Sequence, residues 1–184
     1  IELIASLDTA GAIRSRLQAR GIEAGGQTVE QFDATLDGTR QNHELALEMI
    51  HREVEVRLAL AGAAGEQWQQ WQGELSRGEL LVTGQDQRWQ LRKPADLLFK
   101  TAKNGAEPQL TFAEHCWQWQ QSALCGGNQT LLPAVDVEYR IINLPSQALA
   151  SLLPENLRWQ ANINGSIDFT LGAEGPSGAI ALDA

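Results

Sequence analysis

Apolar and polar residues alternate along most of the chain. In residues 44–62, ELALEMIHREVEVRLALAG, an apolar side chain occupies nearly every second position. A period of two places one set of side chains on each face of a β-strand. The apolar positions are odd before Ile50 and even after Glu53, so the stretch predicts two strands with a turn or bulge between them. We expect a hairpin with one aliphatic face, in which Glu48 lies opposite Glu55 on the charged face.

The same alternation recurs in the rest of the chain, where glycine, asparagine and aspartate punctuate it at intervals that suit strands joined by turns. Asp37-Gly38 and Asn164-Gly165 are dipeptides that favour tight hairpin turns. Residues 11–23 fit alternation and helical spacing about equally, so strand and helix are both open there. A short helix is favoured near 145–153, where leucines follow helical spacing between two prolines. The chain as a whole predicts an all-β, mostly antiparallel structure.

Two architectures use strand faces of this kind. In a β-sandwich, two sheets bury each other's apolar faces. In an elongated sheet that wraps around its own apolar face, that face stays partly open. Both require the same period of two, so alternation alone leaves the choice between a closed core and an open surface undecided.

Composition restricts the function. The chain has 184 residues, 43% hydrophobic and 20% charged, which is typical of a folded domain. It begins in the middle of a strand pattern, so we expect residues 1–184 to be a single β-rich segment of a longer repetitive protein. A net charge of −9 disfavours nucleic acid and anionic lipid head groups as partners. If lipid binds, the acyl chains must provide the affinity.

The two cysteines lie in the sequence HCWQWQQSALCGG. A hairpin that turns at Gln120-Gln121 places Cys116 directly opposite Cys125. Opposed residues of an antiparallel pair lie about 4.5 to 5.5 Å apart at Cα, within reach of a disulfide. A disulfide implies an oxidising compartment, whereas two buried thiols in a reducing one are the alternative. His115 is adjacent, but the sequence offers no further ligands at metal-binding spacing.

Catalytic signals are weak. The chain has no nucleophile elbow, phosphate-binding loop, dinucleotide fingerprint or HExxH motif. Glu53 and Glu55 resemble a glycosidase pair only in composition, since alternate acids commonly line a solvated strand face. We therefore expect a protein that is not an enzyme and uses no cofactor or metal.

Tryptophan supports a different hypothesis. Several of the tryptophans lie in glutamine-rich runs, as in EQWQQWQG and CWQWQQ. Exposed indoles beside amide side chains are typical of sugar-binding surfaces, so a carbohydrate-binding β-sandwich is the alternative function. The simpler interpretation is that these rings cover strand edges or the core. The six are Trp68, Trp71, Trp89, Trp117, Trp119 and Trp159.

A succession of short motifs resembles the C-terminal portion of the TamB family. In order they are WQLRKPADLLF (89–99), Cys116, ALCGG around Cys125, INLPSQALASLLPE (142–155) and INGSIDFTLGAEG (163–175). Residues 1–88 share only the general two-faced strand style. The sequence CGGNQTLL departs from the family, which more often has a hydrophobic residue, glycine and tryptophan there.

The resemblance implies a periplasmic protein anchored in the inner membrane of a Gram-negative bacterium, part of the translocation and assembly module. Its fold is expected to be an elongated, curved, taco-like sheet with an apolar concave groove. Its partners are expected to be TamA, an outer-membrane barrel, and phospholipid acyl chains or nascent outer-membrane protein strands. Its roles are expected to be phospholipid transport and assembly of autotransporters and other barrels, without an active site. The expected groove lining is Leu45, Leu47, Met49, Val54, Val56, Leu58, Leu60, Val135, Val137, Tyr139, Ile163, Ile167 and Phe169.

Overall fold

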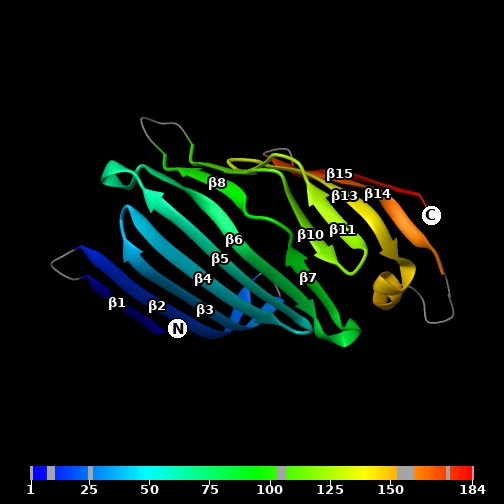
Figure 1. Cartoon of the computed structure of the whole chain (residues 1–184), viewed down its shortest axis with the longest axis horizontal. Helices are drawn as coiled ribbons and strands as arrows, with labels where there is room; N and C mark the ends of the chain where they lie inside the picture. Colours follow the sequence, from blue (N-terminus) through cyan, green and yellow to red (C-terminus); the bar gives the residue numbers. More distant parts are fainter. Residues whose placement is uncertain are drawn as a thin grey trace.

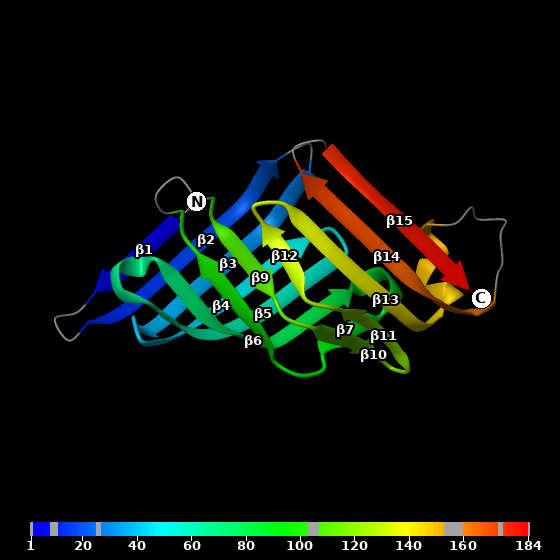
Figure 2. The ribbon, with the colours of Figure 1, turned by 90° about the horizontal axis from the view of Figure 1, so that it is seen from above.

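The computed structural model describes residues 2–7, 11–24, 27–102, 107–152, 160–172 and 175–183. Within them the chain is all-β and forms one antiparallel, 15-stranded sheet that twists along its length (Figures 1 and 2). The strands are β1 (Glu2–Leu7), β2 (Ala12–Ala24), β3 (Gln27–Thr39), β4 (Asn42–His51), β5 (Val54–Ala64), β6 (Gln70–Val82), β7 (Gln87–Leu91), β8 (Ala95–Lys100), β9 (Gln109–Phe112), β10 (His115–Trp119), β11 (Ser122–Gly126), β12 (Gln129–Leu132), β13 (Val135–Pro145), β14 (Asn162–Gly172) and β15 (Gly175–Asp183). Short 3-10 helices follow β5, β6 and β13, namely η1 (Glu66–Trp68), η2 (Thr83–Gln85) and η3 (Ser146–Leu152).

The first six strands form a meander in which each strand pairs with the next. The predicted hairpin at 44–62 is β4–β5, and its apolar residues share one face as expected. The predicted pairing of Glu48 with Glu55 is wrong, because Glu48 lies opposite Arg57. This register moves the turn to Arg52-Glu53 and brings the Arg57 Nε to 3.3 Å from the Glu48 Oε1. The observed register differs from the predicted one by two residues. This difference leaves every side chain on its predicted face, and it replaces the like-charge pair of Glu48 and Glu55 with an ion pair.

The sheet divides at β6. One edge of β6 pairs with β5, whereas the other edge pairs with β8 over Gln70–Leu75 and with β7 over Glu79–Val82. From there one arm runs through β7, β10 and β11 and the other through β8, β9 and β12, and both arms end on β13. Strands β6 to β13 therefore close into a ring of pairings, which we call the ring. We call β1–β5 the N-terminal wing and β14–β15 the C-terminal wing.

Neither predicted turn dipeptide lies in a turn. Asp37-Gly38 lies inside β3, and the turn comes later at Arg40-Gln41. Asn164-Gly165 lies inside β14, where the Asn164 Oδ1 accepts a hydrogen bond of 2.9 Å from the backbone N–H of Asn143. Asn143 lies at the bulge in β13, where its backbone N–H has no partner in the ladder of backbone hydrogen bonds with β14. The Asn164 side chain accepts this hydrogen bond instead. A Cβ at Gly165 would clash with the backbone of the neighbouring β15, so this glycine permits close approach and does not mark a reversal.

The helical predictions had mixed outcomes. Residues 11–23 belong to strand β2, so alternation is correct there and the helical alternative is wrong. The short helix near 145–153 is present as η3, but it is a 3-10 helix. Its first residue, Ser146, donates its backbone N–H to the Ala161 carbonyl at 2.9 Å, and its Oγ accepts from the Ala161 N–H at 3.1 Å. Leu153, Pro154 and Trp159 lie outside the described residues.

The molecule buries little of its apolar surface. Its accessible surface is 12,368 Å², whereas a compact protein of this mass exposes about 8,700 Å². Among the described residues, the buried hydrophobic side chains are Ala19, Ala64, Leu75, Ala95, Leu144 and Ile163. Most other apolar side chains are half-buried. No helix in the described part of the chain has the length and hydropathy needed to cross a bilayer.

Candidate functional site: an apolar face along the sheet

One face of the sheet carries apolar side chains from wing to wing. Directly opposed residues of an antiparallel pair share a face. In the N-terminal wing, Ala34 lies opposite Leu47, and Leu47 lies opposite Leu58. In the C-terminal half, Tyr139 of β13 lies opposite Ile167 of β14, which lies opposite Ile180 of β15. The alternating apolar set is therefore a single surface, which we call the apolar face.

The predicted lining residues fall into two groups on this face. In β4 and β5, Leu45, Leu47 and Met49 lie opposite Leu60, Leu58 and Val56, whereas Val54 lies opposite His51. In β13 and β14, Val137 lies opposite Phe169 and Tyr139 opposite Ile167, whereas Val135 lies opposite Leu171 and Ile163, beyond the bulge, lies opposite Leu144. The ring connects the two groups through residues that the predicted lining omitted. These are Leu80, Trp89, Leu91, Trp117, Leu124 and Ile141. Their alternation is visible in the sequence, but only the pairing of β7 with β10 and of β11 with β13 shows that they join the same face.

The apolar face is accessible. Of the predicted lining residues only Ile163 is buried, and Phe169 is exposed at 38% of its surface. Beside Phe169, Leu171 is 43%, Ile180 is 68% and Leu182 is 53% exposed. A dry sandwich core would bury side chains of this size almost completely. The apolar face is therefore partly accessible to solvent, most of all on β14 and β15.

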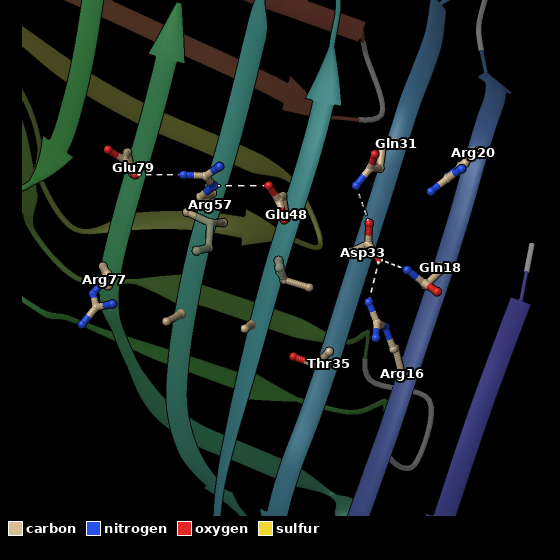
Figure 3. A pocket seen from close by; sticks show the side chains of 14 residues that line it. Arg16, Gln18, Arg20, Gln31, Asp33, Thr35, Glu48, Arg57, Arg77 and Glu79 are labelled. Atoms are coloured by element: carbon tan, nitrogen blue, oxygen red, sulfur yellow. Dashed lines mark hydrogen bonds and ion pairs between the residues drawn. The ribbon is translucent and has the colours of Figure 1, made fainter.

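The opposite face of the N-terminal wing is charged. A shallow depression of about 710 Å³ lies over it, lined chiefly by charged and amide side chains (Figure 3). Arg57 lies at its centre, 3.3 Å from Glu48 and 3.8 Å from Glu79, and it also pairs with Glu55. Figure 3 looks onto these side chains, and the yellow and brown strands of the C-terminal half lie behind the wing. The charged face is thus turned to solvent and the apolar face toward the rest of the molecule.

Asp33 shows how polar partners balance charge on this face. Its carboxylate accepts a hydrogen bond from Gln18 and another of 2.8 Å from Gln31. The bond from Gln18 is the largest cause of a lowered pKa at Asp33, followed by the bond from Gln31. Arg16 lies 3.7 Å away and adds to this effect. These interactions favour the ionised carboxylate of Asp33 on the charged face.

The predicted disulfide is present. Cys116 lies directly opposite Cys125 in the β10–β11 hairpin, with a Cα–Cα distance of 4.0 Å. The turn falls at Gln120-Gln121, as predicted. The disulfide shares the polar side of this hairpin with Gln118, because residues of one parity share a face. It therefore reinforces the ring without occupying the apolar face.

A polar network fills the ring next to the disulfide. The buried His115 donates from Nδ1 to the Ala113 carbonyl at 2.9 Å, and its Nε2 lies 2.9 Å from the Tyr139 hydroxyl. Phe112 stacks on the imidazole, and Tyr139 also lies within 3.4 Å of the buried Gln129. Burial is the main cause of a lowered pKa at His115, so the neutral ring that accepts from Tyr139 is favoured. Tyr139 is thus fixed by hydrogen bonds as well as contributing to the apolar face.

Within the described residues, four of the five tryptophans are half-buried in the sheet. Trp89 lies against Trp119 with ring centroids 5.7 Å apart, both half-buried in the ring. The Nε1 of Trp71 donates to the His43 Nε2 at 2.7 Å. A Cβ at Gly78 would clash with the indole of Trp117, so this glycine makes room for the ring. Trp68 alone among them is exposed, at 54%, in the turn after β5.

Together these features define a class of protein, an elongated β-sheet with two different faces. The described chain is an elongated antiparallel sheet with one accessible apolar face and one charged face, and it has no cluster of three or more residues that could hold a metal. The chain belongs to the TamB family, because the family model "TamB, N-terminal domain" matches residues 4–184. No curated protein and no solved structure matches the chain.

The matched domain corrects the expected position in the family. The motifs of residues 89–175 resembled the C-terminal portion, but the match is to the N-terminal domain, and it includes most of residues 1–88. The motifs lie largely on strands β7, β8, β10, β11, β13 and β14, and two-faced strands of this kind recur along the whole sheet. They indicate the family but carry little information about position along a repetitive sheet. The TamB family is a non-enzymatic structural component of the translocation and assembly module, which it forms with TamA, and it serves outer-membrane biogenesis.

Proposed function

We propose that the apolar face shelters phospholipid acyl chains or the apolar side chains of unfolded outer-membrane protein strands as they cross the periplasm. The observation that carries this proposal is the continuous apolar face whose large side chains remain half-exposed. The chain acts there as one segment of a longer protein anchored in the inner membrane and working with TamA. Membership of the TamB family supports that setting.

The physics of the two faces supports a groove for apolar cargo. Acyl chains gain about 0.8 kcal/mol for each methylene removed from water, so an aliphatic surface binds them without any polar recognition. A charged outer face and a net charge of −9 keep the remaining surface in water and away from anionic head groups. Figure 2 shows that the strands of β1–β6 run in a different direction from those of β13–β15.

Site-specific photo-crosslinking tests the proposal. Crosslinkers at Leu47, Val56 and Leu58, which share the apolar face, are expected to capture phospholipid or client protein in the periplasm. Matched positions on the charged face of the same strands, Ala46 and Glu55, are expected to capture neither. Capture from the charged face with none from Val56 would show that the functional face has been assigned wrongly.

A further inference from the structure

The Cys116–Cys125 disulfide lies on the side of the sheet opposite the apolar face, where a small cavity opens beside it. Both cysteines are half-buried, and both line this cavity, which has a volume of about 290 Å³. Gly126 and Gly127 form part of its wall, and a Cβ at Gly127 would meet no atom within 4 Å. The space beside the disulfide can therefore admit a small group from solvent.

The register of the ring places an arginine on each side of the disulfide. Arg140 of β13 lies directly opposite Cys125 of β11. On the other side, the backbone N–H of Arg92 donates to the Cys116 carbonyl at 2.8 Å, which continues the pairing of β7 with β10 one residue beyond Leu91. Directly opposed residues share a face. The order across these four neighbouring strands (Figure 1) is therefore Arg92, Cys116, Cys125 and Arg140.

Neither arginine is neutralised by an acidic side chain at ion-pair distance within the described chain. The ion pairs of the described residues include neither Arg92 nor Arg140, and both side chains are exposed. A neighbouring guanidinium stabilises a thiolate relative to a thiol. Reactive cysteines typically lie in partly exposed, electropositive surroundings, whereas structural cysteines are buried among apolar groups. The surroundings of this disulfide are of the first kind.

The other charges around the cavity are paired or lie farther from Cys125. Lys93 lines the cavity, and its Nζ lies 3.4 Å from the Glu114 Oε1. Glu138 also lines the cavity, but it lies two residues from Arg140 along β13 and is therefore diagonal to Cys125. Among these charged residues, Arg140 is the one that the register places directly opposite a sulfur-bearing residue on the cavity wall.

We propose that the Cys116–Cys125 disulfide is a site of thiol–disulfide exchange whose co-reactant is a dithiol. A thiolate of the dithiol attacks the Cys116 Sγ, the sulfur–sulfur bond breaks, and its electron pair leaves with the Cys125 Sγ as a thiolate opposite Arg140. The second thiolate of the reductant then attacks the reductant's own sulfur in the mixed disulfide and releases Cys116. The dithiol is oxidised to a disulfide, and its two electrons and two protons pass to the two cysteines.

Arg140 sets the direction of attack. Exchange is faster when the departing sulfur is the better-stabilised thiolate, so Cys125 leaves and Cys116 is attacked. The backbone pairing of β10 with β11 does not depend on the sulfur–sulfur bond, so exchange removes a covalent link from the ring and leaves the hairpin in place. This activity goes beyond the proposed function, because the disulfide does not lie on the apolar face.

Reduction kinetics of the oxidised 184-residue protein test the proposal. The protein is mixed with dithiothreitol, an uncharged dithiol, at pH 7 without denaturant, and free thiols are counted over time by alkylation and mass spectrometry. The rate should rise linearly with the dithiothreitol concentration, because the reductant attacks the folded protein. A rate that does not depend on the dithiothreitol concentration would show that the disulfide reacts only after unfolding, and it would overturn the proposal.

Variants that keep the disulfide test the role of the arginine. Arg140→Gln removes the charge opposite Cys125 and should slow reduction by about three- to tenfold, whereas Arg140→Lys should stay within about twofold of wild type. Arg20→Gln is the matched control, because Arg20 is also an exposed arginine but lies on β2 in the N-terminal wing. Circular dichroism checks that all three variants fold. Equal rates in Arg140→Gln and Arg20→Gln would overturn the proposal.

Single-cysteine variants distinguish the two sulfur atoms. Cys116→Ser leaves Cys125 opposite Arg140, and its alkylation by iodoacetamide at pH 7 should slow by about threefold when Arg140→Gln is added. Cys125→Ser leaves Cys116, whose alkylation should respond less to the same change. A larger effect of Arg140→Gln on Cys116 would contradict Cys125 as the leaving sulfur. If either serine variant fails to fold, the rates of the disulfide-bonded arginine variants still decide.

Discussion

The ring and the wings are built from the same alternating strands but have different interiors. In the ring, the two arms between β6 and β13 enclose their inner side chains, and Leu75, Ala95 and His115 are almost completely buried. In the wings, most of the corresponding side chains of β4, β5, β14 and β15 remain half-buried or exposed, whereas Ala64 of β5 and Ile163 of β14 are buried. Closure of the strand pairings therefore decides whether an apolar strand face becomes a dry core or an accessible surface.

The polar contents of the two regions differ in the same way. The ring holds buried polar groups that all have partners, including the Ser122 Oγ, which donates to the Asn143 carbonyl at 2.9 Å. Burial without such partners would cost free energy, so the ring must be specifically assembled. The N-terminal wing keeps its charges on the outer face, where many of them form ion pairs and hydrogen bonds with one another. We infer that the ring stabilises the fold and that the wings carry the surface through which the protein acts.

The largest expected effect compares an aspartate in each region. Leu75→Asp buries a carboxylate at a position only 4% exposed in the ring, and we expect it to cost on the order of 4 kcal/mol or to unfold the protein. Leu58→Asp places the same group on the half-buried face of the N-terminal wing, where it can reach water, and should cost no more than about 2 kcal/mol. Urea unfolding measures both. Equal losses would contradict the distinction between ring and wing.

Removing the disulfide should have the next largest effect. The Cys116–Cys125 loop is short, and the loop-entropy relation gives about 2.7 kcal/mol of stabilisation. Cys116→Ser with Cys125→Ser should therefore lower the Tm by roughly 5 to 10 °C. Thiol titration of the denatured wild-type protein should detect no free thiol. Because the disulfide lies in the ring, crosslinking from Leu47 in the wing should survive in any variant that remains folded, and its selective loss would contradict the division of roles.

Acidification should weaken the ring through His115. Burial lowers the pKa of His115 in the folded protein below the value of ~6.5 expected in the unfolded chain. As the pH falls below this value, the unfolded chain binds more protons than the folded protein does. The stabilisation that the neutral imidazole gives to the folded protein is therefore fully present above pH ~6.5 and is lost as the pH falls below it. For a single titrating group, the free energy of unfolding cannot change by more than about 1.4 kcal/mol per pH unit.

The control for this prediction is His115→Gln, which keeps a polar side chain but does not titrate. The difference in unfolding free energy between wild type and variant should shrink from pH 7.5 to pH 5.5, and urea titrations at both values measure it. A difference that stays constant or grows on acidification would assign the pH dependence to other groups.

The smallest expected effect lies on the charged face of the N-terminal wing. Arg57→Ala removes the ion pairs with Glu48, Glu55 and Glu79. Because Arg57 is solvent-exposed, these pairs are screened, and the Tm should change little and converge with that of wild type in high salt. Thermal melts at low and high ionic strength test this. A large loss that persists in high salt would show that this face also stabilises the fold.

The sequence by itself determined the strands and their faces. A period of two is a local property of each segment, so the apolar side of β4, β5, β13 and β14 could be assigned before any pairing was known. The disulfide was predictable for the same reason, because a hairpin of so few residues leaves little choice of register between Cys116 and Cys125. Dipeptide turn preferences failed at Gly38 and Gly165, where glycine permits close packing of neighbouring strands inside the sheet.

Only the tertiary structure decided which parts of the apolar face are buried. Strand β6 pairs with β7 along one part of its edge and with β8, the strand after β7, along the rest, and nothing local in the sequence marks this division. The same holds for the pairing of β11 and β12 with one edge of β13, which closes the ring. Long-range pairing depends on the free energy of the whole sheet, whereas alternation is encoded residue by residue. The local pattern therefore defines the two faces, and closure of the sheet determines where the apolar face remains accessible to solvent.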